Sequence, residues 1–401
     1  MTCRKLAMPF RRAVLAAILT FAIAAPAAAL PDLKDWPAIA TAAQGGTVRL
    51  GLAGGSAGQQ RFLDWAGGEL ERLYGIRLEI VDFPSQRTLL DALGAGDESG
   101  IDMAALGSRA VAEARRTQLL PERYAYRLPN WHFVDRAGTP SVIIAAGLPT
   151  HYSAVPWGKR SLTLYANGAA TASRPDSPAA LLTYARANPG RFAFPDPATP
   201  AGAAFVEEVL RSLAEDPSVL DRPIAAADAD AVAAPLFAWL DEIRPLLWQE
   251  GQSFPRSEAE ARDLLARGEV DMIADFNLLA GAAGRAGGRW PEGVEGFGFA
   301  NGEVTDTHFL AVAADAAAPE AALVAADFML SPVAQIRKAD PAMWGDATIL
   351  DPSRLPQQEA QDLRALMRSG SPRMSGLAIP RPHYSWMEWL DERVPEHLAA
   401  R

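Results

Sequence analysis

The sequence predicts an α/β protein made of two similarly built lobes. Short apolar strands alternate with amphipathic helices, which is the pattern of a largely parallel sheet covered by helices on both faces. A unit of helix, glycine and acidic-apolar strand occurs once in each half of the chain, at 89–104 and at 264–274. The 401 residues also exceed what one hydrophobic core usually needs and suffice for two.

The first 29 residues differ in composition from the rest of the chain. A basic start precedes an uncharged run at 13–25 that is apolar except for Thr20, and Pro26 and three alanines follow it. This run is shorter than the roughly 20 residues that span a bilayer, which argues against a membrane anchor. We therefore predict a signal peptide, residues 1–29, cleaved after Ala29, and a periplasmic mature protein. The pair Arg11-Arg12 leaves open whether export uses the general or the twin-arginine route.

Composition excludes several classes of function. The one cysteine, Cys3, lies in the predicted signal peptide, so the mature chain has neither disulfides nor a catalytic thiolate. The chain is acidic, with a net charge of −10, and has no stripe of Lys and Arg, which disfavours nucleic-acid binding. The five histidines have no metal-ligand spacing, and no nucleotide-binding glycine motif occurs, so we expect no metal and no cofactor.

In the first half, three strands are predicted at 47–52, 77–81 and 101–106 because apolar residues alternate or run together there. Helices follow the first two strands, and the apolar residues of the first helix recur at helical spacing up to a terminal glycine, Gly75. A turn and strand at 155–165 then lead into the second half. There a strand at 192–195 precedes an amphipathic helix, and a second strand ends at 274.

A further strand is predicted at 307–314, followed by an alanine-rich helix that ends at Ser331-Pro332. The last quarter of the chain has no sheet pattern of its own, so we expect it to return and cover the first lobe. The predicted first lobe is therefore discontinuous, 30–158 and 307–401, and the second lobe is 159–306.

Polar loops at the carboxyl ends of strands are the candidate binding residues, because open α/β sheets bind ligands there. The loop Gly54-Gly55-Ser56 follows the first strand and opens a helix, where free N–H groups can meet a ligand. It also fits G-x-S-x-G, the nucleophile elbow of serine hydrolases. Too few residues precede it to supply the strands and oxyanion donor that a hydrolase needs. A ligand loop, a simple tight turn and a nucleophile at Ser56 remain the three alternatives.

The other candidate residues lie at matching places in the two halves. Ser108 and Arg109 follow the third strand, and Asp275 and Asn277 follow the corresponding strand of the second half. For these residues, helix N-capping is the alternative to ligand contact. The loop 196–202 opens a second-half helix, and its candidates are Thr199 and Gly202. Among the aromatic residues, the candidates for the cleft are Trp157 and Trp344, with Tyr384 and Trp386 also considered.

The stretch 318–335, with Pro319-Glu320 and Phe328-Met329-Leu330-Ser331-Pro332, resembles the corresponding segment of bacterial extracellular solute-binding proteins. The order of features along about 370 residues also resembles that family. These features are a tryptophan-containing opening helix, the Gly-Gly loop, Pro156-Trp157-Gly158 at the crossover, a Phe-x-Phe-Pro-x-Pro strand end and Trp344-Gly345-Asp346. The resemblance is strongest to a subfamily near the thiamine-, polyamine- and iron-binding members.

The resemblance implies a type II periplasmic-binding fold, in which two α/β lobes joined by two hinge strands close on a ligand. It also implies a monomeric, non-catalytic substrate-binding component that delivers a small solute to an inner-membrane ABC permease with its ATPase. The sequence leaves the ligand open among polyamines, thiamine, metal ions, sugars and organic acids. A cation would favour Asp275 and Trp157, whereas an anion would favour Arg109 and helix N-termini.

Overall fold

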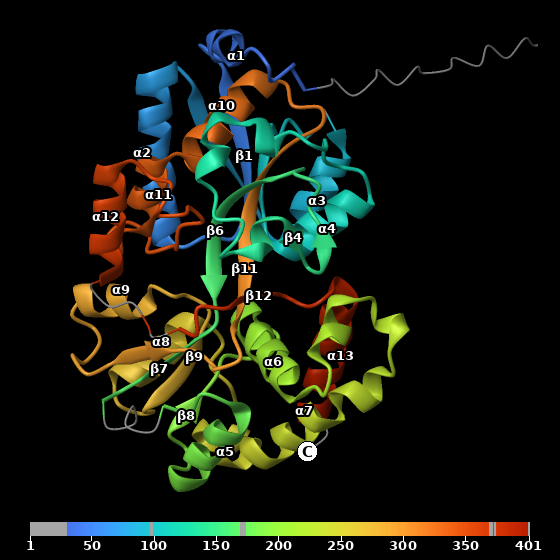
Figure 1. The fold of residues 1–401 in the computed structure, drawn as a ribbon, viewed down its shortest axis with the longest axis vertical. Coiled ribbons are helices and arrows are strands. Elements are labelled where there is room, and N and C mark those ends of the chain that lie inside the picture. The colour runs from blue at the N-terminus through green and yellow to red at the C-terminus, as the bar shows by residue number, and fades with distance from the viewer. Residues whose placement is uncertain (1–29, 97–98, 169–173, 369–371, 373, 400–401) are drawn as a thin grey trace, which may run out of the picture.

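A computed structural model describes residues 30–96, 99–168, 174–368, 372 and 374–399. The described chain forms two α/β lobes, one above the other in Figure 1, with long strands running between them. The predicted two-lobe α/β fold is therefore confirmed. The predicted signal peptide lies outside the described residues. No helix of the described ranges is both long and apolar enough to cross a membrane.

The sheet of the first lobe has the strand order β12-β11-β3-β1-β2, and β6 also pairs with β11, along 305–310. Strands β1, β2 and β3 are parallel, as the sequence predicts, whereas β11 is antiparallel to both β3 and β6. The bounds of these strands are β1 (Thr47–Ala53), β2 (Arg77–Phe83), β3 (Met103–Leu106), β6 (Val155–Ser161), β11 (Glu303–Val312) and β12 (Ala378–Pro380).

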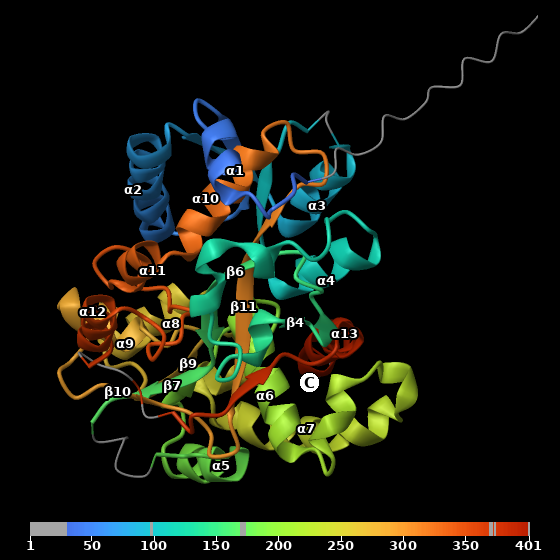
Figure 2. The same ribbon diagram turned by 45° about the horizontal axis from the view of Figure 1, so that its top comes forward.

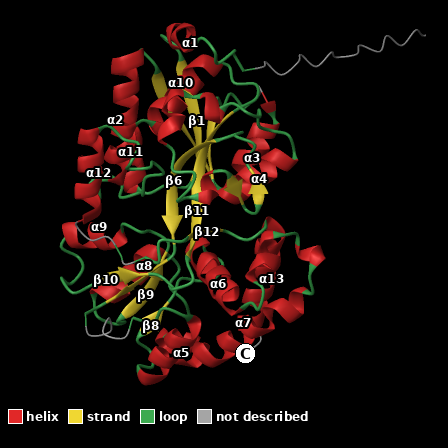
Figure 3. Ribbon diagram, in the orientation of Figure 1, coloured by secondary structure: helices red, strands yellow, loops and turns green. Residues whose placement is uncertain are grey.

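Helices cover both sides of this sheet (Figure 3). In α2 the buried residues Phe62, Leu63, Ala66 and Leu70 recur at helical spacing, and Gly75 in a left-handed conformation ends the helix. The helices are α1 (Trp36–Ala42), α2 (Ala57–Tyr74), α3 (Gln86–Gly94), α4 (Ser108–Arg116), α10 (Pro319–Leu330), α11 (Pro332–Ala339) and α12 (Gln357–Arg368). A short hairpin, β4 (Ile144–Ala145) and β5 (Leu148–Pro149), adjoins α4.

The second lobe has a smaller sheet of order β10-β7-β9-β8. Its strands are β7 (Thr163–Ala166), β8 (Phe192–Ala193), β9 (Met272–Asp275) and β10 (Glu295–Phe297). Its helices are α5 (Pro178–Ala187), α6 (Pro200–Leu213), α7 (Ala229–Ile243), α8 (Glu258–Ala266), α9 (Ala280–Ala286) and, from the end of the chain, α13 (Tyr384–Ala399). One large apolar core joins α5, α6, α7 and α13 to this sheet.

Two antiparallel strands, β6 and β11, connect the lobes. They pair from Thr305 with Ser161 to Leu310 with Val155, and the register shifts by one residue at His308/Phe309. β6 passes directly into β7 of the second lobe, while β11 begins in the second lobe and ends beside β3 in the first. A third crossing runs through β12, which pairs with the start of β11.

The last helix departs from the sequence prediction. We expected all of 307–401 to cover the first lobe, but Trp386, Leu390 and Val394 of α13 are buried in the core of the second lobe. Figures 1 and 2 both place α13 near α6, which it contacts. An apolar stripe on a helix shows that a face is buried, but it does not show which partner covers that face. The other predicted lobe boundaries remain predictions.

Candidate binding cleft

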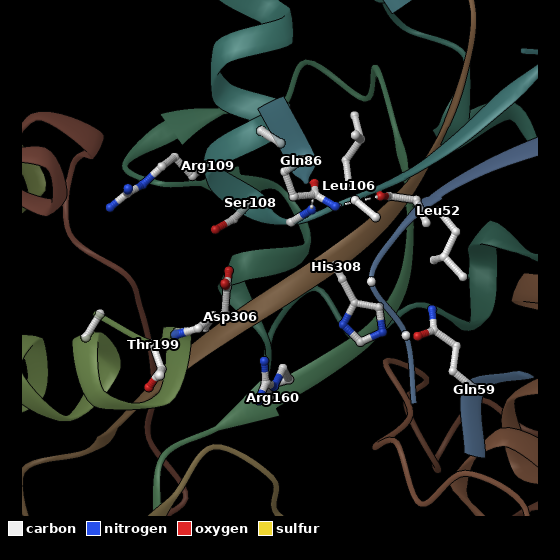
Figure 4. A pocket seen from close by; sticks show the side chains of 18 of the residues that line it. Leu52, Gln59, Gln86, Leu106, Ser108, Arg109, Arg160, Thr199, Asp306 and His308 are labelled. Atoms are coloured by element: carbon white, nitrogen blue, oxygen red, sulfur yellow. Dashed lines mark hydrogen bonds between the residues drawn. The ribbon is translucent and has the colours of Figure 1, made fainter. Parts of the chain in front are cut away.

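A cavity of about 760 Å³ lies between the lobes and is lined by residues from both. Figure 4 shows its wall, with α4 and the first-lobe strands on one side and α6 on the other. Nine of the eleven residues predicted as ligand contacts line this cavity, namely Gly54, Gly55, Ser56, Ser108, Arg109, Trp157, Thr199, Asn277 and Trp344. Gly202 and Asp275 lie outside the lining.

The Gly54-Gly55-Ser56 loop ends β1 and starts α2. Gly54 has φ of 71°, a left-handed conformation that disfavours other residues, and this turns the chain into the helix. Ser56 is the N-cap of α2, and its hydroxyl accepts a hydrogen bond of 3.1 Å from the backbone N–H of Gln59. The loop thus lines the cavity, but its serine oxygen already satisfies the helix.

The start of α4 is built differently. Gly107 occupies the N-cap position and provides no side-chain cap, and its own N–H donates to Gln86 Oε1 at 3.1 Å. Gln86 Nε2 in turn donates to the carbonyl of Ala105, which fixes this side chain beside β3. Ser108 is the first residue inside the helix, is 2% exposed, and its hydroxyl has no hydrogen-bond partner. Ser108 is therefore not the N-cap that the sequence left open as an alternative.

In the second lobe, Thr199 caps α6. Its hydroxyl accepts from the N–H of Gly202 at 3.2 Å and donates to the carbonyl of Asp196 at 2.6 Å. Gly202 is absent from the cavity wall for a steric reason. A Cβ atom at this position would lie 2.2 Å from the carbonyl oxygen of Asp196, so glycine lets the loop pack on the helix. The structure thus gives Gly202 a packing role, and its predicted ligand contact stays a prediction.

Asp275 is also buried away from the cavity. It is fully buried and forms two hydrogen bonds, of 2.5 and 2.8 Å, with the guanidinium of Arg262. Burial raises the pKa of Asp275, and the Arg262 charge opposes this rise. Arg262 itself lines the cavity, so Asp275 positions a cation there rather than meeting a ligand. A direct ligand contact of Asp275 stays a prediction, and the pairing with Arg262 does not favour it.

Asn277 lines the cavity and links the lobes. Its side-chain oxygen accepts from the N–H of Leu279 at 2.8 Å, which forms a tight turn after β9. Its side-chain nitrogen donates to the carbonyl of Gly345 at 3.1 Å, and Gly345 follows α11 of the first lobe. Asn277 is not the N-cap of α9, which is Leu279, and its predicted ligand contact stays a prediction.

The two predicted tryptophans lie together in the wall. The rings of Trp157 and Trp344 are 5.1 Å apart between centroids, and Phe62 of α2 packs against both. Trp157 is 1% exposed, and its indole N–H has no hydrogen-bond partner. A buried Trp N–H usually finds an acceptor, and the N–H of Trp157, a residue of the cavity wall, has none. Of the two aromatic residues also considered, Trp386 lies in the second core, and neither it nor Tyr384 lines the cavity.

Sequence reasoning missed the charged residues that the hinge strands contribute to the wall. Asp306 and His308 of β11 and Arg160 of β6 line the cavity. His308 Nε2 lies 3.0 Å from Asp346 Oδ2, but outside hydrogen-bond geometry, and Asp346 also pairs with the buried Lys338. The sequence signal for Asp306 and His308 is a run of polar residues, 305–308, before the apolar second half of the strand.

The cationic side chains in the wall are all paired. Arg160 contacts Glu258 at 2.5 Å, and both line the cavity. Arg109, expected as a free cation for an anionic ligand, instead pairs with Asp391 of α13 at 2.5 Å. The described residues contain no group of three or more His, Cys, Asp or Glu side chains that could hold a metal ion.

The serine-hydrolase alternative gains no support from this geometry. A catalytic serine needs a histidine within hydrogen-bond reach, and that histidine needs an orienting acid. The Ser56 hydroxyl is bonded to the N–H of Gln59, and His308, the histidine of the cavity wall, contacts Asp346. The elbow-like sequence is thus a helix cap.

Comparison with known proteins identifies the family of this chain. Residues 65–363 match the family described as bacterial extracellular solute-binding protein. Protein YnjB of Escherichia coli (strain K12) is 35% identical over 365 residues, which cover 90% of this chain and 92% of that protein.

Solved structures of low sequence identity share the fold. An ABC transporter structure from Clostridium perfringens has a TM-score of 0.63 at 12% identity and covers 88% of this chain and 99% of its own. The spermidine/putrescine substrate-binding protein PotD of Streptococcus pneumoniae has a TM-score of 0.60 at 12% identity, with coverages of 88% and 98%. With the family match spanning most of the chain, the protein belongs to the bacterial extracellular solute-binding protein family.

Proposed function

We propose that this protein is the substrate-binding component of an ABC importer and captures a small solute between its two lobes in the periplasm. The cavity shared by both lobes carries this proposal, because Ser108 and Trp157 are buried there without partners. A buried polar group without a partner costs about 1–3 kcal/mol. A solute that supplies the missing partners therefore gains affinity from groups that the protein leaves unsatisfied.

The proposed contacts come from both lobes and from the loop after α11. They are Gly54, Gly55, Ser56, Ser108, Arg109, Trp157, Thr199, Asn277 and Trp344, joined by the hinge-strand residues Arg160, Asp306 and His308. A solute held by both lobes favours the closed arrangement over open ones, which shifts the population toward it. The closed arrangement is then the form that an inner-membrane permease with its ATPase recognises. No reaction is required, and we propose a monomer without catalytic activity.

A thermal-shift screen of the mature protein tests the function. The panel contains polyamines, thiamine, iron salts, sugars, organic acids and amino acids. A solute present at a hundredfold excess over its Kd should add about 2.7 kcal/mol to the free energy of unfolding. The recovered solute should be chemically unchanged by mass spectrometry. A panel that yields no stabilising solute, or a solute that is converted during incubation, would contradict the proposal.

A further inference from the structure

The helix N-termini at the cavity are not equivalent. Ser56 caps α2 and Thr199 caps α6, each by accepting a backbone N–H. α4 starts after Gly107 and has no side-chain cap. The first N–H groups of a helix have no acceptor within the helix, and the helix dipole adds partial positive charge there. The start of α4 is therefore suited to an oxyanion.

Two buried side chains give independent evidence for a ligand here. Ser108 lies in the first turn of α4, and its hydroxyl is unpartnered in the cavity wall (Figure 4). The indole N–H of Trp157, which can only donate, is also unpartnered in the same wall. The Ser108 hydroxyl, the Trp157 indole N–H and the N–H groups at the start of α4 can all donate hydrogen bonds. A ligand with acceptor oxygens would satisfy them.

A carboxylate faces the same cavity from the hinge. Side chains alternate along β11: Thr305 and Thr307 are buried and hydrogen-bond to Ser161 and Ser141, while Asp306 lines the cavity (Figure 4). In the β3–β11 ladder Leu106 pairs with Phe309. Because these strands are antiparallel, the segment after Leu106, which contains Ser108, and the segment before Phe309, which contains Asp306, leave the ladder at the same end. The donor groups and the carboxylate thus share one end of the sheet.

The charges around Asp306 do not balance. The buried guanidinium of Arg381 forms two hydrogen bonds with Glu207, which is also buried, and lies 3.5 Å from Asp306. Arg109, which also lines the cavity, forms an ion pair with Asp391. Arg160, which lies opposite Asp306 in the β6–β11 ladder, is paired with Glu258. Three guanidinium groups thus face four carboxylates. Asp306, whose side chain is 15% exposed, lines the cavity and shares the charge of Arg381 with Glu207. A cationic group on the ligand completes this cluster.

We infer that the solute is a small zwitterion, an amino carboxylic acid, whose carboxylate binds at the start of α4 beside Ser108 and whose protonated amine pairs with Asp306. This inference rests on the proposed function and specifies its ligand class. A simple anion would leave the Asp306 charge uncompensated, and a simple amine would leave the donors of Ser108, Trp157 and the helix terminus unpaired. A zwitterion satisfies both ends.

Calorimetry with matched probes tests the inference. The amino acids are glycine, L-alanine, L-glutamate, β-alanine and 4-aminobutyrate. The matched analogues lack one group each: propionate and ethylamine for β-alanine, butyrate and propylamine for 4-aminobutyrate. We expect at least one amino acid to bind, and analogues that lack either charged group to bind about 10- to 100-fold more weakly, the loss typical of a missing charged hydrogen bond.

Variants locate the two ends of the probe. Ser108→Ala and Asp306→Asn should each weaken binding of the amino acid about 10-fold or more. The matched controls lie outside the cavity: Ser177→Ala removes the N-cap of α5, and Asp271→Asn breaks an ion pair with Arg191. Both controls should bind like the parent protein, and melting curves of all four variants confirm that they fold.

Three outcomes would overturn the inference. The first is an analogue that binds as tightly as its amino acid, and the second is unchanged affinity in both Ser108→Ala and Asp306→Asn. The third is stabilisation by a solute of another class with no binding of any amino acid at millimolar concentration. This third result would leave the proposed transport function intact, whereas the absence of any stabilising solute would contradict that function as well.

Discussion

Arg109 of α4 and Asp391 of α13 form an ion pair across the two lobes, with Nη1 and Oδ2 2.5 Å apart. Both residues line the cavity, so the pair closes part of the space in which a solute would bind. Their side chains are 39% and 41% exposed. An exposed pair of this kind contributes about 0.2–1 kcal/mol and is screened by salt. It can hold the lobes together without preventing them from opening.

Removing this pair should open the solute-free protein. Arg109→Ala is expected to increase the radius of gyration measured by small-angle X-ray scattering at low salt, and 1 M NaCl should have a similar effect on the parent protein. The control is Arg186→Ala, which breaks an exposed ion pair with Glu242 inside the second lobe and should leave the radius unchanged. Equal radii for the two variants would show that the pair does not restrain the lobes.

A second prediction concerns Gly202 in α6. A Cβ atom there would lie 2.2 Å from the Asp196 carbonyl and 2.4 Å from that of Pro195, both of which are backbone atoms. Gly202→Ala should therefore destabilise the protein by about 1–3 kcal/mol, the usual cost of overpacking. Gly68 in α2 is the matched control, because a Cβ atom added there would have no other atom within 4 Å. Gly68→Ala should instead stabilise by about 0.5–1 kcal/mol.

Urea unfolding of both variants checks this prediction. The free energies of unfolding should move in opposite directions from that of the parent protein. A Gly202→Ala variant as stable as the parent would mean that the 196–202 loop can move away from the helix.

A third prediction concerns pH. Burial raises the pKa of Asp327 to about 6 from 3.8, although hydrogen bonds from Asn130 oppose the rise. The folded state therefore holds this proton more tightly than the unfolded chain. The resulting stability is present below pH 3.8 and is lost as pH rises through about 6. A difference of this size corresponds to up to about 3 kcal/mol.

The variant Asp327→Asn carries no ionisable proton at this position. Its stability relative to the parent protein should therefore rise between pH 4 and pH 7, by up to about 3 kcal/mol, because only the parent must ionise a buried acid. Urea unfolding at the two pH values measures this difference. A stability difference that stays constant between the two pH values would show that Asp327 titrates normally in the folded protein.

The processing of the N-terminus gives a fourth prediction. The basic start, the short apolar run and Ala27-Ala28-Ala29 predict that the exported chain begins at Leu30. The intact mass of protein released from the periplasm should correspond to residues 30–401. Recovery of the chain with residues 1–29 in the membrane fraction would contradict this prediction.

The sequence was sufficient to predict the sheet-end loops of the cleft. Gly54 and Ser108 follow parallel strands of the first lobe, which end at one edge of the sheet, so their loops lie together there. Asn277 follows β9 of the second lobe and lines the same cavity from the other side. The hinge-strand residues were not predictable in this way. Asp306 and His308 lie inside β11, and their exposure to the cavity depends on how the two lobes face each other across β6 and β11.

Ion pairs between residues far apart in the sequence also could not be predicted. Arg109 was expected to be available to an anionic ligand because its partner, Asp391, lies on α13, whose packing against the second lobe was not predicted. Arg381, which reaches the cavity just before that helix, was missed for the same reason. Asp275 was expected at the surface of the cleft, but the alternation of β9 turns it inward to Arg262. Each error arises from a tertiary contact that leaves no local pattern.

Filling the cavity from the second lobe tests the central claim most directly. Ala203 of α6 lines the cavity, whereas Ala234 of α7 is exposed elsewhere in the same lobe. A solute that stabilises the parent protein by about 2.7 kcal/mol at a hundredfold excess over its Kd should not stabilise Ala203→Trp, because the indole occupies its space. The same solute should stabilise Ala234→Trp fully. Full stabilisation of Ala203→Trp would contradict the account and place the binding site outside the cleft.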